Sequence, residues 1–568
     1  MIKWRVNLIL ISIFVFGATI IGRLVFLQII DREEARAFAK GQQKFFEEVQ
    51  APRGEIIIKD KAGNNYTLAA DKIFQFVYAS PPEVKDKNDV AEKLSQILNI
   101  GKEQILEKLE NDESLFAVLK TKLTDSELQN IKDLNIEGIY LKDEAMRYYP
   151  LETLASHVVG FIGAEGIGQY GIEGFYNDIL FGESGFMEGE KSRSGYSIFF
   201  NIADFFQPKK GTDLELTIDY NIQFQAENLL KKNREKLEFE QATIIVADSV
   251  SGKILALANY PNFNPNEYSK IKNLDIFQNA ALQKLYEPGS VFKPITMSTA
   301  LDKEKITPQT TYIDEGKLKF GGYTISNYDG KEWGKRTMTE VLERSINTGA
   351  VFAEEAVGNN NFIEYVKRFG FFEKTGIDLQ GESWSENKNL QTGRDINCAT
   401  AAFGQGVEVT PMQLIRAFSA IANGGKLINP YIVDGFKQNT EEKQIISSRT
   451  ASQVQGMMVS VLENGYSKNI RIPGYWVAGK SGTAQVPWTS LGINKAGYSE
   501  KTIHSFIGFG PAYNAKFLIL IKLDNPNTYS SEFSAAPIFK ELARYIIDYW
   551  QIPPDYDVNN PPQTSNSQ

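Results

Sequence analysis

Apolar residues run almost without interruption from Val6 to Gly22. The run has about the minimum length, roughly 17 residues, that an α-helix needs to cross a bilayer. Lys3 and Arg5 precede it, which predicts an N-terminus in the cytoplasm and the rest of the chain outside the membrane. A cleaved signal peptide is the alternative, but its apolar core is shorter, roughly 7–15 residues, and no good cleavage site follows here. The pattern predicts an uncleaved transmembrane anchor within residues 1–30.

Residues 31–210 alternate between short apolar runs and amphipathic stretches. The segment to about residue 50 is charged and helix-prone, and "RGEIIIKDKAGNNYTLA" then reads as a β-hairpin around its Gly-Asn-Asn turn. "NDVAEKLSQILNIG" places its apolar residues on one helical face, with Asp89 and Glu92 at capping-box spacing. "TDSELQNIKDL" repeats this pattern with Thr124 as its cap. None of these segments carries chemistry, so we expect an elongated, mixed α and β pedestal domain.

The pattern changes near Gly211. "LELTIDYNIQFQ" passes from strand to helix, and "ATIIVADSVSGKILALAN" reads as two strands joined by a turn at Gly252. The chain is then mainly helical from about residue 290 to 440, and strands return in "YWVAGKSGTAQV", "SFIGFGPA" and "KFLILIKLDNP". Strands at both ends of residues 211–550 predict one sheet of distant segments with helices around it. Residues 551–568 are rich in Pro, Asn and Gln and are predicted to be a disordered tail.

The amino-acid composition limits the kinds of binding site and catalytic group that the chain can contain. A chain of 568 residues predicts two or three folded units, and its net charge of −9 gives no electrostatic footprint for nucleic acid. The single cysteine, Cys398, excludes an intramolecular disulfide and a Cys-Cys metal site. The two histidines, His157 and His504, lie in apolar surroundings typical of core residues. The base of any hydrolase or transferase here is therefore expected to be a lysine or a carboxylate, and we expect no metal or organic cofactor.

The stretch "YEPGSVFKPIT" holds a serine and a lysine three residues apart, Ser290 and Lys293. On a helix these side chains share one face. Pro294 is tolerated only if the helix begins near Ser290, where backbone N–H groups have no intrahelical partner. This places the Ser290 hydroxyl at the positive end of the helix dipole. Alone, the pattern is more typical of a serine cap with a surface lysine, because Ser-x-x-Lys occurs often by chance.

Two further motifs follow. "LERSINTGAVF" puts Ser345 and Asn347 two residues apart, which in loop or extended backbone project the same way. A helix cap with a turn-forming asparagine is the alternative interpretation.

The last motif lies in "VAGKSGTAQV". On a strand, Lys480 and Gly482 share one face and Ser481 and Thr483 the other. Gly482 removes a side chain where a ligand backbone could come close. An ordinary edge strand with small polar residues is the alternative.

Taken together in this order, the three motifs resemble those of penicillin-binding proteins and class A β-lactamases, with serine for threonine in the third. Over nearly its whole length the chain resembles a class B penicillin-binding protein, a membrane-anchored peptidoglycan D,D-transpeptidase. "RYYPLETLASHVVGFIG" and "GQYGIEGFYNDIL" resemble pedestal motifs, and "LTIDYNIQ", "FGQGVEVTPMQL" and "SFIGFGPA" resemble transpeptidase-domain landmarks. The resemblance implies an α/β (α+β) penicillin-binding-protein/β-lactamase-like domain, with an antiparallel sheet flanked by helices. A single transmembrane helix and a dimerisation-type pedestal are expected to precede this domain in the chain.

The resemblance also implies a covalent mechanism. Ser290 is the expected nucleophile, and Lys293 the base that takes its proton, with a pKa lowered by burial and a nearby lysine. Ser345 is expected to relay a proton to the leaving D-alanine. The backbone N–H groups of Ser290 and Thr483 are expected to form the oxyanion hole.

Substrate contacts follow from the same resemblance. Asn347 is expected to hold the amide of the donor peptide. Lys480, Ser481 and Thr483 are expected to bind the terminal carboxylate of a D-Ala-D-Ala stem peptide beside Gly482, and Lys480 to hold the Ser345 hydroxyl. The acceptor is the amine of a second stem peptide, and β-lactams are expected to acylate the same serine.

We expect a single-pass protein of the bacterial cell membrane, with its catalytic domain outside the cytoplasm. Its expected partner is a membrane glycan polymerase of the shape, elongation, division and sporulation family, with division-type motifs slightly favoured. Three alternatives stay open: a β-lactamase or β-lactam sensor, a soluble D,D-carboxypeptidase, and a non-catalytic wall-synthesis scaffold. "GESWSENKNLQ" fits poorly as the extra carboxylate segment of a β-lactamase, and the intact motifs disfavour a scaffold.

Overall fold

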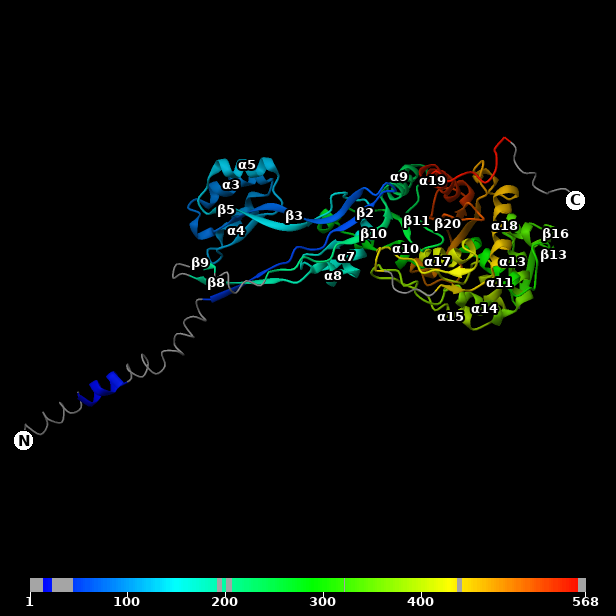
Figure 1. The fold of residues 1–568 in the computed structure, drawn as a ribbon, viewed down its shortest axis with the longest axis horizontal. Coiled ribbons are helices and arrows are strands. Elements are labelled where there is room, and N and C mark those ends of the chain that lie inside the picture. Colours follow the sequence, from blue (N-terminus) through cyan, green and yellow to red (C-terminus); the bar gives the residue numbers. More distant parts are fainter. Residues whose placement is uncertain are drawn as a thin grey trace, which may run out of the picture. The chain divides into compact units, whose positions relative to one another are not determined.

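The computed structural model describes residues 14–22, 44–191, 197–200, 207–320, 322–436 and 442–559 (Figure 1). Its contacts define two compact units, Met1–Gly54 with Phe181–Thr212, and Glu55–Leu180 with Asp213–Gln568. In the described part of the chain, no helix is both long and apolar enough to cross a membrane. Residues 14–22 are helical, and residues 1–13 and 23–30 of the predicted anchor segment lie outside the described residues.

The first unit contains a small antiparallel sheet in the order β1-β8-β9. Its strands are β1 (Lys44–Val49), β8 (Gly185–Lys191) and β9 (Ser197–Phe200). The prediction of a helix-prone stretch up to residue 50 is therefore wrong for β1. Pairing with a strand far along the chain overrides the local helix propensity here.

In the second unit, the long strand β3 forms the predicted hairpin with β2, and β10 pairs β2 in parallel. The strands of this sheet are β2 (Ile56–Lys59), β3 (Asn65–Ala79), β4 (Ala117–Lys120), β5 (Ile139–Tyr148) and β10 (Leu214–Asp219). Against the second half of β3 lie the helices α3 (Lys87–Leu98), α4 (Lys102–Glu110) and α5 (Asp125–Leu134), which share a small core with that strand.

Of the two helix caps predicted in this region, the one on α5 is confirmed and the one on α3 lies at a different residue. Thr124 and Glu127 form the reciprocal capping box expected at the start of α5. The cap of α3 is instead Asp86, whose side chain accepts a hydrogen bond from the Asp89 N–H. The helix therefore starts before Asp89, because Asp86 offers an equally good acceptor one turn earlier.

The central sheet runs in the order β12-β11-β21-β20-β19, and every neighbouring pair is antiparallel. Its strands are β11 (Gln241–Ala247), β12 (Ile254–Tyr260), β19 (Ala478–Pro487), β20 (Tyr498–Gly510) and β21 (Phe517–Asp524). This confirms the predicted sheet of distant segments. It also makes β19 an edge strand, so that one side of its backbone is free of sheet partners.

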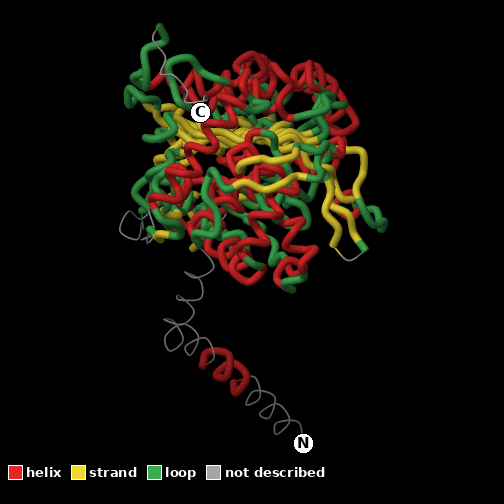
Figure 2. Tube along the Cα trace, turned by 90° about the vertical axis from the view of Figure 1, so that its right-hand side faces the viewer, coloured by secondary structure: helices red, strands yellow, loops and turns green. Residues whose placement is uncertain are grey.

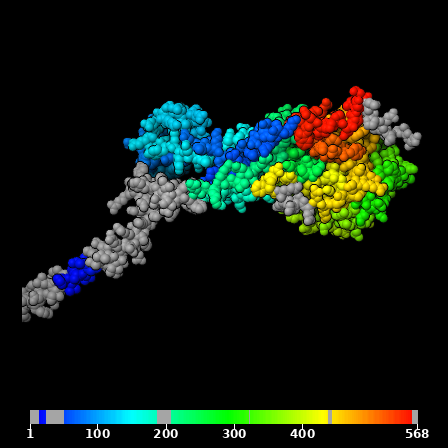
Figure 3. All heavy atoms as spheres, in the orientation of Figure 1, coloured from blue at the N-terminus to red at the C-terminus, as the bar shows by residue number. Residues whose placement is uncertain are grey.

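Helices cover both faces of this sheet, and Figure 2 shows the strands as one band between two groups of helices. α9 (Tyr220–Leu237) and α19 (Ala535–Trp550) contact each other and the sheet. α17 (Pro411–Ala422) and α18 (Ser448–Asn464) form a second contacting pair, and α11 (Lys293–Asp302) packs on α18. Segments far apart in sequence meet on the visible surface, as the colours of Figure 3 show.

Between α11 and α18 the structure adds two small two-stranded antiparallel sheets to the predicted helices. They are formed by β13 (Thr311–Asp314) with β16 (Gly334–Thr337), and by β14 (Lys317–Phe320) with β15 (Tyr323–Ser326). The helices that follow are α12 (Met338–Glu343), α13 (Asn347–Val357), α14 (Asn359–Arg368), α15 (Lys388–Gln391) and α16 (Asp395–Ala401).

The contacts divide the chain differently from the predicted domains. Three short helices lie within the predicted pedestal: α6 (Ser156–Val159), α7 (Gly171–Phe175) and α8 (Asn177–Phe181). Their residues Val158, Ile172 and Leu180 belong to the large core around the central sheet, so residues 55–180 fall into the second unit by their contacts. The chain also keeps contacts with the folded domain beyond residue 551, where the disordered tail was predicted to begin. Asp555 accepts a hydrogen bond from the Trp476 N–H, and the Ile552 carbonyl accepts one from Tyr475. Residues 560–568 lie outside the described part.

Candidate active site

The Ser290 turn is built as the sequence predicts. Gly289–Phe292 forms a 3-10 turn that leads directly into α11, and Pro294 lies in the first turn of that helix. Gly289 has a φ of +61°, and a Cβ there would lie 3.0 Å from the Cβ of Ala484 on β19. Glycine is required by both the backbone conformation and the close approach of the edge strand. Ser290 is thereby placed beside β19.

The Lys293 amine is the centre of the cluster. Its side chain is fully buried, and Nζ lies 3.0 Å from Ser290 Oγ. Nζ also lies 2.6 Å from the carbonyl oxygen and 3.2 Å from Oγ of Ser345, and 2.8 Å from Oδ1 of Asn347. The structure thus brings the first two predicted motifs together around one nitrogen.

No carboxylate of the described residues hydrogen-bonds to this nitrogen. Burial lowers the pKa of Lys293 well below its ordinary value, and the nearby Lys480 ammonium lowers it further. A neutral amine has two N–H donors and one lone pair. In this neutral form, the Ser345 carbonyl and the Asn347 amide oxygen, which can only accept, take the two N–H groups, and the lone pair is left for the hydroxyl proton of Ser290.

Ser345 sits in a sharp turn between α12 and α13. Its φ of +55° is in the left-handed region, which costs a non-glycine residue of the order of 1–3 kcal/mol unless its surroundings fix it. Asn347, the first residue of α13, donates from Nδ2 to the carbonyl of Ser326 at 3.0 Å. This contact orients the amide so that its oxygen faces Lys293.

Lys480 reaches the same cluster from β19. Its buried Nζ lies 3.1 Å from Ser345 Oγ and 2.8 Å from the Ser481 carbonyl. Burial lowers the pKa of Lys480 to about 8, against the opposing effect of the Glu532 carboxylate. Lys480 therefore stays mostly charged at neutral pH.

Ser481 and Thr483 both face the turn at Ser531 and Glu532, on one side of β19, as the alternation of side chains along a strand predicts. The Ser481 hydroxyl donates to Glu532 at 2.6 Å, and the Thr483 hydroxyl accepts from the Ser531 N–H at 3.1 Å. The structure gives a second reason for Gly482, beside the predicted approach of a ligand backbone. A Cβ there would lie 3.0 Å from the Pro288 carbonyl oxygen, so the missing side chain makes room for the Ser290 turn.

Sequence patterns missed the polar network behind Asn347. Asp314, at the end of β13, is buried and accepts hydrogen bonds from Asn327 and from the hydroxyl of Thr348. The Thr348 N–H donates to Asn327 Oδ1 at 3.1 Å. A single aspartate in a weak strand pattern gives no signal of this kind, because its partners are distant in sequence. Glu532 was missed for the same reason.

The histidines and the cysteine are core residues, as predicted. His157 is buried against the Ile276 carbonyl, and burial lowers its pKa to about 4. The ring of His504 bonds to the hydroxyls of Thr502 and Ser534, and burial lowers its pKa to about 4 as well. Burial raises the pKa of the Cys398 thiol to about 12. None of the three is poised to act as a base or nucleophile near neutral pH.

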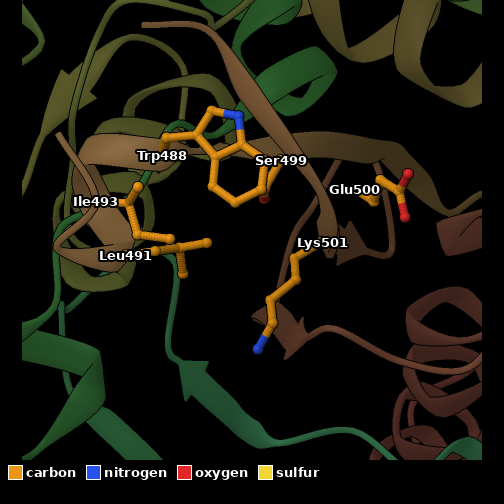
Figure 4. A pocket seen from close by; sticks show the side chains of 6 residues that line it. All are labelled: Trp488, Leu491, Ile493, Ser499, Glu500 and Lys501. Atoms are coloured by element: carbon orange, nitrogen blue, oxygen red, sulfur yellow. The ribbon is translucent and has the colours of Figure 1, made fainter. Parts of the chain in front are cut away.

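A pocket of about 480 Å³ opens beside the loop between β19 and β20 (Figure 4). It is lined by Trp488, Leu491, Ile493, Ser499, Glu500 and Lys501. None of the predicted site residues lines it, and the reactive groups are buried at the other end of β19. The pocket does not mark the reactive centre.

The fold and the cluster define a serine enzyme in which a buried lysine, and not a histidine, faces the nucleophile. Two family descriptions match the chain: "Penicillin binding protein transpeptidase domain" over residues 242–544 and "Penicillin-binding Protein dimerisation domain" over residues 48–216. The chain belongs to the class B penicillin-binding proteins.

Individual relatives agree with this assignment. Stage V sporulation protein D of Bacillus subtilis is 31% identical over 94% of this chain and 84% of that protein. Peptidoglycan D,D-transpeptidase FtsI of Escherichia coli is 26% identical over 98% of this chain and 93% of its own. The crystal structure of penicillin binding protein 2X from Streptococcus thermophilus superimposes with a TM-score of 0.69 at 26% identity, covering 89% of this chain and 81% of that one.

Proposed function

We propose that this protein cross-links peptidoglycan by D,D-transpeptidation through an acyl-serine intermediate. The contact between the buried Lys293 amine and the Ser290 hydroxyl, at 3.0 Å, carries the proposal. Ser290 Oγ attacks the carbonyl between the two terminal D-alanines of a stem peptide, and its proton passes to Lys293. The C–N bond breaks, D-alanine leaves, and the amine of a second stem peptide then displaces the serine from the ester.

Ser345 links the two lysines. Its hydroxyl lies 3.2 Å from Lys293 Nζ and 3.1 Å from Lys480 Nζ, so a proton taken from Ser290 has a short path to the leaving nitrogen. The charge on Lys480 orients this hydroxyl and attracts the terminal carboxylate of the substrate, together with the Ser481 and Thr483 hydroxyls.

Binding and charge stabilisation use the neighbouring backbone. The N–H groups of Ser290, in the first turn of its helix, and of Thr483, on the edge strand, form the oxyanion hole, and each donor of such a hole is typically worth about 2.7–4 kcal/mol. Asn347 holds the donor-peptide amide, and Gly482 keeps β19 close to the Ser290 turn.

The test is acylation of the full-length protein, purified in detergent, by a labelled penicillin. Mass spectrometry of the digest should find the adduct on Ser290, and the Ser290→Ala variant should carry none. An adduct on another residue would reject Ser290 as the nucleophile. Release of the adduct within seconds would indicate a β-lactamase, and rescue of growth by Ser290→Ala would indicate a scaffold.

The N-terminal segment anchors the enzyme in the bacterial cell membrane with the catalytic domain outside. The apolar run and the preceding Lys3 and Arg5 support this orientation. A reporter enzyme that folds only outside the cytoplasm is fused to the C-terminus and should be active. An intact but inactive fusion would refute the proposed orientation.

A membrane glycan polymerase of the shape, elongation, division and sporulation family is the partner that this arrangement fits. Cross-linkers placed within residues 1–30 should capture this polymerase in whole cells. A variant whose anchor has the same residues in scrambled order, and so the same hydrophobicity, should no longer capture the polymerase.

A further inference from the structure

Glu532 brings a carboxylate of the chain itself to the third motif. It lies in the short 3-10 turn Ser531–Phe533, between β21 and α19. Its Oε1 accepts a hydrogen bond from the Ser481 hydroxyl, with the two oxygens 2.6 Å apart. The preceding residue, Ser531, donates its N–H to the Thr483 hydroxyl at 3.1 Å. Both hydroxyls that the proposed function assigns to the substrate carboxylate therefore already have partners in this turn.

The charges around Glu532 favour its ionised form. Burial raises its pKa, but the hydrogen bond from Ser481 and the Lys480 ammonium outweigh this effect and hold the pKa of Glu532 below its ordinary value. Glu532 in turn stabilises the charged form of Lys480. Ser481 thus holds a carboxylate, and that carboxylate acts electrostatically on Lys480, before any substrate arrives.

We infer that Glu532 is a specificity-determining residue that competes with the terminal carboxylate of the substrate for Ser481 and Lys480. This inference rests on the proposed function, in which those two residues bind that carboxylate. The Ser481 hydroxyl has one proton to donate, so it cannot serve both carboxylates at once. A second negative charge beside Lys480 also repels the incoming one. The Glu532 side chain is only partly buried, so it can rotate away when a ligand enters.

The competition predicts a difference between charged and uncharged ligands. The probes are benzylpenicillin, which carries a carboxylate, and its methyl ester, which does not. Second-order acylation constants are measured on the full-length protein and on Glu532→Gln. The variant should raise the acid-to-ester ratio by about tenfold, as expected for one hydrogen bond to a charged group. Glu235→Gln, which removes an exposed glutamate on α9, is the matched charge control and should leave the ratio unchanged.

Glu532→Asp keeps the charge and withdraws the carboxylate by one methylene, so it should raise the ratio by a smaller factor. It also serves if Glu532→Gln does not fold. A ratio that stays constant or falls in the folded variants would overturn the inference, because Glu532 would then hold Ser481 ready for the ligand. Failure of the proposed function looks different: neither probe would label Ser290 in the unaltered protein.

Discussion

Asp314 offers the sharpest test of how the fold holds the Asn347 segment. Its buried carboxylate accepts hydrogen bonds from the N–H groups of Gly316 at 3.2 Å and Trp333 at 2.8 Å. It also accepts from Asn327 Nδ2 at 3.0 Å and from the hydroxyl of Thr348. Since Thr348 directly follows Asn347, this one carboxylate ties β13 to the start of α13.

The cost of removing Asp314 can be estimated from these donors. Asn327 Nδ2 also donates to the Lys331 carbonyl, and the Thr348 hydroxyl also donates to Asn327 Oδ1, so both keep a partner in Asp314→Ala. The N–H groups of Gly316 and Trp333 lose their acceptor, and at about 1–3 kcal/mol each the free energy of unfolding falls by about 2–6 kcal/mol, less where water enters. Asp314→Asn keeps one acceptor oxygen. If that oxygen takes the place of Oδ1, only the bond from Trp333 and one of the two from Asn327 are lost, and we expect about 2 kcal/mol.

The assay compares thermal unfolding and penicillin acylation of Asp314→Asn with those of Glu315→Gln, a control at the neighbouring exposed position. We expect the melting temperature of Asp314→Asn to fall by about 4 °C or more. Its acylation should slow as well, because Asn347 loses its support, while the control changes neither quantity. A melting temperature and a rate equal to those of the control would show that the network does not hold this segment.

Three further predictions follow from the buried charges. Lys293→Ala should slow acylation by about 10²–10⁴-fold, the usual contribution of a general base, and adduct kinetics within tenfold of normal would contradict that role. The acylation rate should rise with pH as Lys293, whose pKa lies well below its ordinary value, loses its proton, and should fall above about pH 8 as Lys480 loses its charge. A rate that keeps rising well beyond pH 8 would argue against a charged Lys480. Glu173→Ala removes one of two carboxylates that pair with the buried Arg147 guanidinium, the one at 2.7 Å, and leaves Asp71 at 3.3 Å. The free energy of unfolding should fall by about 1.5–3 kcal/mol, and an unchanged melting temperature would refute this.

Local signals predicted those parts of the fold that depend on neighbouring residues. Pro288, Gly289 and Pro294 fix where α11 can begin, so the placement of Ser290 one turn before Lys293 was readable from the sequence. Long apolar runs likewise identified β11, β12, β20 and β21. The same reasoning failed for β1 and for the two small sheets β13–β16 and β14–β15. These strands are short and rich in polar residues, and the partners of β1 and β13 lie far along the chain.

The fold, and not the Ser-x-x-Lys motif itself, causes the lowered pKa of Lys293. A lysine three residues after a serine is exposed in most helices, and its amine is then charged. Here the amine is buried because the Ser290 turn, the Ser345 turn and the edge strand close around it. Two glycines permit this closure, since a Cβ at Gly289 or Gly482 would press the turn and the strand apart. The reactivity of Ser290 therefore depends on Gly289 and Gly482 as much as on Lys293, although neither glycine contributes a reactive atom.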